Sequence, residues 1–158
     1  VMGISRNFGI SFAKAQNASK NTLPKEGKIF ISLADCDKQF ALSVARAFVE
    51  LGFSVCATSG THKILQAKQI PSSCVLKISE GRPNIKDFIT NKEIALAINT
   101  SDGAQSSNDA KSIRREVLKN PIPYFTTIAA ALAAAQSIKE IQKQDSNIPK
   151  PLQEFMQD

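Results

Sequence analysis

Five short apolar runs, separated by segments of helical periodicity, constrain the fold of this chain more than any other feature. Each run has the length of a buried strand, and the intervening segments carry apolar residues at three- and four-residue spacing. The apolar runs are residues 28–34, 53–58, 73–78, 94–99 and 122–127. The helical segments are residues 37–52, 61–69, 84–92, 107–120 and 128–144. This alternation predicts an α/β fold in three layers, with a mainly parallel five-stranded sheet and helices on both faces.

Two further segments flank this alternation. Ile4, Phe8, Phe12 and Ala15 share one helical face, which predicts an N-terminal helix before the sheet. A polar, turn-forming stretch follows and indicates a linker, so we expect this helix to be set apart from the rest. The predicted organisation is a helix and linker over residues 1–27, a domain over residues 28–143 and a tail over residues 144–158.

The composition favours a cytoplasmic protein that is neither secreted nor inserted in a membrane. No apolar stretch approaches the roughly 20 residues that a membrane-spanning helix needs. Cys36, Cys56 and Cys74 are odd in number and have no CxxC spacing, which argues against a disulfide framework and against a zinc site. Because the chain begins with Val1, we expect a piece of a longer protein.

The net charge of +6 is compatible with nucleic acid or with a small acidic ligand. The basic residues are spread along the chain, and, with one Tyr and no Trp, they are not interleaved with aromatic residues. We therefore expect no nucleic-acid partner. Two interpretations stay open, a generally positive surface and a pocket for a phosphate group.

The residues that follow the predicted strands favour the pocket. In parallel sheets, ligands bind beyond the carboxyl ends of the strands. Here those ends carry hydroxyl, amide or lysine side chains, at Lys38, at Thr58–Thr61, at Lys77, at Asn99–Ser101 and at Thr126–Thr127. Together with free N–H groups at helix N-termini, such residues suit an anion. The alternative for each single loop is a plain helix cap, because Ser, Thr and Asn favour that position.

Signatures of catalysis are missing from the sequence. His62 is the single histidine, and neither a GxGxxG nor a GxxxxGK[ST] motif occurs. No cysteine–histidine or histidine–carboxylate grouping suggests a nucleophile or a metal site. The sequence therefore predicts binding without catalytic or metal-ligating residues.

Several motifs carry a resemblance to a known family. They are ATSGTHKIL, ISEGRPNIKDFITNKEI, INTSDG, DAKSIRREVL and PYFTTIAAALAAAQSI, in this order. With VMGISRNFGISFAKAQ at the start, the match runs from Val1 to about Ile138. The sequence resembles the C-terminal regulatory domain of the carbamoyl phosphate synthetase large chain, which has a methylglyoxal-synthase-like fold. Residues 1–27 then resemble the end of the preceding synthetase half and its linker.

The resemblance implies two ligands. Nucleotide monophosphate effectors such as UMP or IMP would bind at the strand ends, with the threonines and lysines on the phosphate and Asn99 near the ribose or base. The positions that match this effector site are Lys38, Thr58, Thr61, Lys77, Asn99, Thr100 and Ser101. Ornithine would bind between this domain and its neighbour, at positions that match Tyr124 and Thr126.

The resemblance also implies a parent enzyme. That ligase makes carbamoyl phosphate from bicarbonate, glutamine nitrogen and two ATP, for pyrimidine and arginine synthesis. It uses Mg²⁺ or Mn²⁺ and K⁺, and it works with a glutaminase small chain. None of those sites falls in this sequence, so we expect a non-catalytic regulatory piece without a cofactor of its own. Its partners would be the rest of the large chain, the effectors and possible further copies of itself.

One stretch departs from the family pattern, and one rival shares the fold. Asp102–Gln105 stand where family members often have basic residues, which bears on the strength of nucleotide binding. The rival is a methylglyoxal synthase, a lyase that acts on dihydroxyacetone phosphate. It needs a Gly-Gly-Asp-Gln stretch, a Trp-Asp-Pro-like loop and active-site histidines for proton transfer. This chain has Glu80–Asn84 and Asn99–Asp102 at those places.

Overall fold

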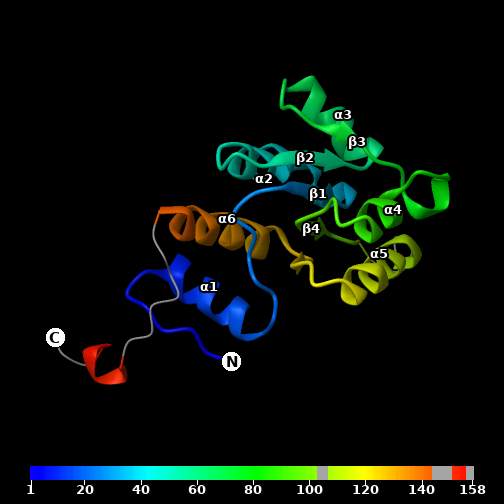
Figure 1. The fold of residues 1–158 in the computed structure, drawn as a ribbon. Helices are drawn as coiled ribbons and strands as arrows, with labels where there is room; N and C mark the ends of the chain where they lie inside the picture. Colours follow the sequence, from blue (N-terminus) through cyan, green and yellow to red (C-terminus); the bar gives the residue numbers. More distant parts are fainter. Residues whose placement is uncertain (103–106, 144–150, 156–158) are drawn as a thin grey trace.

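A parallel sheet lies at the centre of the molecule (Figure 1). The computed structural model describes residues 1–102, 107–143 and 151–155. The strands run in the order β3-β2-β1-β4-β5 across the sheet, and every pairing is parallel. Their bounds are β1 Lys28–Ser32, β2 Ser54–Ala57, β3 Ser73–Cys74, β4 Leu96–Asn99 and β5 Tyr124–Phe125.

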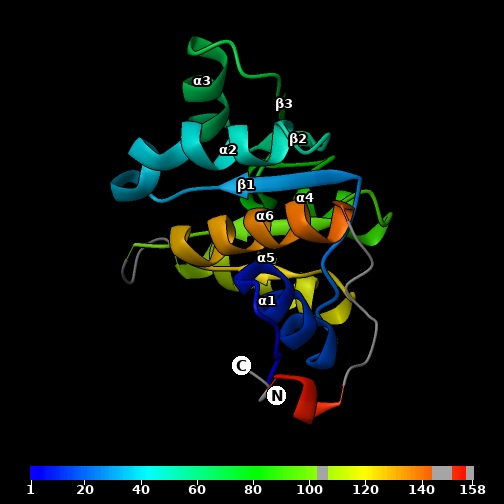
Figure 2. The same ribbon diagram turned by 90° about the vertical axis from the view of Figure 1, so that its left-hand side faces the viewer.

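Helices cover both faces of this sheet. On one face lie α2, α3 and α6, and on the other lie α4 and α5 (Figures 1 and 2). Their bounds are α1 Phe8–Ala18, α2 Ala41–Val49, α3 Ser59–Ala67, α4 Ile85–Thr90, α5 Ser107–Lys119 and α6 Ile128–Lys143. Short 3₁₀ turns are η1 Asp35–Phe40, η2 Ile78–Glu80 and η3 Leu152–Phe155. The predicted three-layer α/β fold with an N-terminal helix is confirmed.

Two cores form because side chains alternate along the strands. In β1, Ile29 and Ile31 face the core that includes α2 and α6, whereas Phe30 faces the core with α4 and α5. All three side chains are fully buried. A strand that buries both faces reads as a continuous apolar run, which explains the run seen in the sequence.

Several predicted elements are shorter than the sequence suggested, among them the fifth strand, which is Tyr124–Phe125. The third strand ends at Cys74, and beyond it Leu76 forms a single bridge with Asn84. This strand is at the edge of the sheet and has only β2 as a neighbour, so little pairing holds its end in register. The predicted helix over residues 37–52 is divided between η1 and α2.

The N-terminal helix packs closely on α6. A Cβ atom built on Gly9 would lie 3.2 Å from the backbone oxygen of Gln136, so glycine allows the two helices to approach. Ile10 and Ala13 are buried in the same core as α2 and α6. The expectation that α1 is set apart from the domain is therefore wrong, because the apolar face of α1 packs against α6. The predicted domain boundary at residue 27 stays a prediction.

The segments at the two ends of the chain touch α1. Lys14 donates a hydrogen bond from Nζ to the carbonyl oxygen of Ile4 at 3.2 Å, and the same Nζ lies 5.9 Å from the centre of the Phe155 ring. Throughout the described ranges, no helix has both the length and the apolar composition to cross a lipid bilayer.

Candidate functional site

A cavity of about 480 Å³ opens at the carboxyl ends of β1, β2 and β4. This is where the strand order reverses, since β2 and β3 lie to one side of β1 while β4 and β5 lie to the other. Such a reversal leaves a crevice in which α/β proteins bind ligands. The described residues that line it are Ser32, Leu33, Ala34, Asp35, Lys38, Thr58, Ser59, Gly60, Thr61, Lys77, Asn99, Thr100, Asp102, Asp109, Ala110 and Ile113.

The first turn of α3 forms one wall of the cavity. Thr58 is the N-cap residue, but its side chain makes no capping hydrogen bond to the helix. The N–H groups at the start of a helix have no partner within it and carry partial positive charge. A Cβ atom built on Gly60 would lie 3.1 Å from Nζ of Lys38, so glycine leaves room for the ammonium group beside this turn.

Two buried threonines fix the loop that follows β1. The Oγ1 atom of Thr61 accepts a hydrogen bond from the Leu33 N–H at 3.2 Å. The Oγ1 atom of Thr100 accepts one from the Ala34 N–H at 2.9 Å. Each hydroxyl still has its own hydrogen to donate. These threonines therefore shape the cavity as well as line it.

Asn99 and Tyr124 are joined by a hydrogen bond. Asn99 is buried at the end of β4, and its Nδ2 donates to Oη of Tyr124 at 3.0 Å. Burial raises the pKa of Tyr124, and the hydrogen bond from Asn99 partly offsets that effect. The bond holds the Asn99 amide in place at the cavity wall.

The cavity combines charges of both signs. Among the described lining residues, Lys38 and Lys77 are cationic and Asp35, Asp102 and Asp109 are acidic. Asp35 forms an ion pair with Lys38, and that hydrogen-bonded ammonium lowers the pKa of the Asp35 carboxyl, with a smaller effect from Lys77. A hydrogen bond from Oγ of Ser79 to Asp109, 3.0 Å long, joins the loop after β3 to α5.

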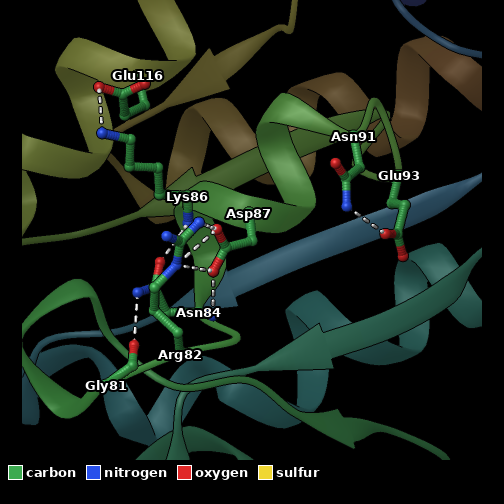
Figure 3. A network of polar contacts seen from close by, with 8 residues as sticks. All are labelled: Gly81, Arg82, Asn84, Lys86, Asp87, Asn91, Glu93 and Glu116. Carbon is green, nitrogen blue, oxygen red and sulfur yellow. Dashed lines mark hydrogen bonds and ion pairs between the residues drawn. The ribbon is translucent and has the colours of Figure 1, made fainter.

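A polar network supports the loop that carries Lys77 (Figure 3). Asp87 in α4 pairs with Arg82 and accepts a hydrogen bond from the Asn84 N–H at 2.9 Å. The bond from Arg82 lowers the pKa of the Asp87 carboxyl, and the bond from Asn84 adds to the effect. In return, Oδ1 of Asn84 accepts from the Lys86 N–H at 3.0 Å, so the two side chains cap the start of α4.

The second part of this network ties α4 to α5. The Glu116 carboxylate lies 3.0 Å from the Lys119 ammonium and 3.7 Å from the Lys86 ammonium. Figure 3 shows the contact with Lys86. The hydrogen bond from Lys119 lowers the pKa of Glu116. These contacts fix α5, and with it Asp109, relative to the rest of the cavity wall.

The structure brings most of the predicted effector residues together. The cavity wall includes Lys38, Thr58, Thr61, Lys77, Asn99 and Thr100. Ser101, Tyr124 and Thr126 are not among the described residues that line it. Ser101 and Thr126 are exposed, and Tyr124 touches the site through Asn99. Of the stretch that departs from the family pattern, Asp102 lines the cavity, and residues 103–105 lie outside the described part.

Sequence reasoning missed Asp109. Its side chain lies four residues before Ile113, which also lines the cavity, and eight before the buried Val117. One helical face therefore leads from the core to the cavity. That spacing is visible in the sequence, but only the packing of α5 shows which end of the face reaches the site.

His62 and groups arranged to hold a metal ion are absent from the described part of this cavity. No group of three or more His, Cys, Asp or Glu side chains there is arranged to hold a metal ion. His62 lies on α3 with Nδ1 2.9 Å from Oγ of Ser72, and it is not among the described lining residues.

Comparisons with known proteins agree on one family. A family model described as an MGS-like domain matches residues 40–126. The chain is 47% identical over 156 residues to the carbamoyl phosphate synthase large chain of Campylobacter jejuni, covering 99% of this chain and 14% of that protein. It is 49% identical over 145 residues to the large chain of Helicobacter pylori, covering 92% and 13%. It is 46% identical over 143 residues to the C-terminal section of the large chain of Aquifex aeolicus, covering 90% and 27%.

Proposed function

Because this chain belongs to the MGS-like domain family, we propose that it is the effector-binding domain of a carbamoyl phosphate synthase large chain. Its cavity binds a nucleotide monophosphate such as UMP or IMP. The piece itself is regulatory, and synthesis of carbamoyl phosphate takes place elsewhere in the protein. The chain covers 14% of the length of the Campylobacter jejuni relative, which leaves ample sequence for that chemistry.

The observation that carries this proposal is the ammonium of Lys38 beside the uncapped first turn of α3. A cation next to a helix N-terminus faces partial charge of its own sign, so an anion between them gains from both. A phosphate would accept hydrogen bonds from the helix N–H groups and from a lysine at once. Lys77 lines the same cavity and adds a second cation.

Other residues of the cavity wall suit the nucleoside. Asn99 and Asp109 line the cavity, and their oxygens can accept hydrogen bonds from ribose hydroxyls or base N–H groups. The volume of about 480 Å³ lies within the range of roughly 300–1,000 Å³ that small-molecule sites occupy.

We assign ornithine to a separate site that includes Tyr124 and Thr126. Neither residue is among the described lining residues of the cavity, so the two effectors would not compete. The hydrogen bond between Tyr124 and Asn99 connects this second site to the first. Because part of the site would come from the neighbouring domain, the isolated chain should bind ornithine weakly and the whole large chain should bind it well.

Calorimetric titration of UMP, IMP, uridine and inosine into the purified chain tests the proposal. We expect at least one monophosphate to bind at one site per chain, and the matching nucleoside to bind at least tenfold more weakly. A nucleoside that binds as tightly as its monophosphate would contradict an anion site. Absence of binding by all four compounds would contradict the proposed function as a whole.

A further inference from the structure

We propose that Asp35 acts as an internal competitor of the ligand: its carboxylate holds Lys38 in the free protein and must leave before a phosphate can take its place. This inference rests on the proposed function of the cavity and concerns its affinity for anions. It identifies Asp35 as a residue that lowers the affinity of the cavity for every anion.

The geometry places the competitor at the mouth of the cavity. Asp35 and Lys38 are one turn apart in η1, their side chains form an ion pair, and both line the cavity. The side chain of Asp35 is 90% exposed, whereas that of Lys38 is 32% exposed. An exposed side chain can swing away into water at little cost, so this carboxylate is displaceable while the ammonium stays at the wall.

The position of the lysine explains why an anion is needed there at all. The Lys38 ammonium lies against Gly60 in the first turn of α3, where the helix end is partially positive. In the free protein, Asp35 supplies the negative charge that offsets this repulsion. Lys77 contributes to the same field, since both lysines lower the pKa of the Asp35 carboxyl.

The cost of displacing Asp35 is the same for every anion, so the competitor lowers the affinity for all of them by the same factor. A monoanion that replaces the Asp35 carboxylate exchanges one unit of charge for another and gains little. A phosphate monoester carries a charge of about −1.5 to −2 near neutral pH, so it interacts more strongly with the same cations and can overcome this cost.

Among the described acidic residues of the cavity wall, Asp35 is the one that forms the ion pair with Lys38. Asp109, on α5, lines the cavity and accepts a hydrogen bond from Ser79. Asp102, after β4, and Lys77, after β3, complete the described charges that face the site. His62 on α3 contacts Ser72 and is not among the described residues that line the cavity.

The test compares D35N with D37N and with the unsubstituted chain. Asp37 lies in the same 3₁₀ turn and carries the same charge, but it is not among the described lining residues. Calorimetry with UMP should show D35N binding about three- to tenfold more tightly, a gain of the size expected from one exposed ion pair plus the repulsion it removes. D37N should stay within about twofold of the unsubstituted chain, because it removes charge without freeing Lys38.

Inorganic phosphate gives the same comparison without the nucleoside. Titrated in the same way, it should bind D35N more tightly than the unsubstituted chain by about the same factor as UMP, because displacing Asp35 costs the same for either ligand. A role of Asp35 in contacts with the nucleoside would instead change UMP binding alone.

Each outcome decides between the two proposals. UMP binding that D35N leaves unchanged or weakens, or that D37N strengthens equally, overturns the competitor and leaves the cavity as an effector site. A gain in affinity for UMP that inorganic phosphate does not share also overturns it. If none of the three proteins binds UMP or phosphate, both the competitor and the proposed function fail.

Discussion

At the scale of single residues, the cavity is built from side chains that serve the fold and the site together. Thr61 and Thr100 hold the loop after β1 through their oxygen atoms, and both face the cavity. Replacing Thr61 would leave the buried Leu33 N–H without its partner, so a loss of binding in such a variant would be hard to separate from a loss of fold. Lys38 has no such structural bond to the backbone of the sheet, and it is the cleaner residue to test.

Lys38→Gln should lower the affinity for a bound nucleotide monophosphate by about 10- to 100-fold, since a hydrogen bond to a charged partner contributes about 1.5–3 kcal/mol. Titration calorimetry measures the change. Lys63→Gln is the matched control, because Lys63 is exposed on α3 and does not line the cavity in the described part. Equal losses in the two variants would mean that only the overall charge matters.

Tyr124 can be titrated directly, because it is the only tyrosine in the sequence. Burial raises its pKa, so ultraviolet absorbance should show ionisation above the ordinary value of about 10. A raised pKa means that the folded state favours the neutral phenol. The stability from this group is therefore complete below about pH 10 and is lost as the pH rises through the folded pKa. Ionisation of the native chain at or below the pH found in urea would contradict this burial.

At the scale of elements, the sequence predicted the sheet better than it predicted the contacts between helices. Apolar runs locate β1 and β4 because both strands are central and buried on both faces. The edge strand β3 has a single neighbour, so pairing rather than composition decides where it ends. The packing of α1 on α6 could not be predicted, because the linker composition says where a helix ends and not where it docks.

Gly9→Val should destabilise the chain by about 1–3 kcal/mol, because its side chain would press against α6 in a contact already close at Cβ. Urea denaturation measures the free energy of unfolding. Ala129→Val is the control, since Ala129 is exposed on α6 and the substitution costs helix propensity alone. A similar loss in both variants would show that α1 does not pack on α6 through Gly9.

Below neutral pH, the cap of α4 should make the free energy of unfolding depend on pH. The folded pKa of Asp87 is lowered, chiefly by Arg82, so its contribution is complete above the pKa of the unfolded chain and is lost as the pH falls through the folded value. Melting temperatures measured from about pH 6 to about pH 3 should fall less steeply for Asp87→Asn than for the unsubstituted chain. Arg82→Gln should flatten the profile as well. An unchanged slope in both variants would contradict the ion pair.

At the scale of the whole molecule, topology turns separate loops into one cavity. Lys38 and Thr58 follow β1 and β2, and Asn99 is the last residue of β4. These strands are neighbours at the point where the strand order reverses. The rule that ligands bind at carboxyl ends of parallel strands was enough to select these loops from the sequence. The rule could not predict that Asp109 lines the cavity or that Ser101 does not. The positions of these two residues depend on how a helix or loop turns after it leaves the sheet.

The absence of catalysis is a prediction about the whole chain. Incubation with dihydroxyacetone phosphate should release no more methylglyoxal than buffer alone, because His62, the only histidine, contacts Ser72 rather than the cavity. A colorimetric assay of methylglyoxal, with a known methylglyoxal synthase as positive control, measures the rate. Production above the buffer background would assign the cavity to the lyase instead.

The most direct test of the central claim is an amide NMR titration of the chain with UMP and with IMP. We predict that one of them shifts the backbone signals of Ser59, Gly60 and Thr61 most strongly, together with that of Asn99, because the phosphate accepts from the first turn of α3 and the nucleoside faces the end of β4. The matching nucleoside without phosphate should leave the α3 signals nearly unchanged. Signals that move elsewhere on the molecule, or that do not move with either nucleotide, would contradict the assignment of this cavity as an effector site.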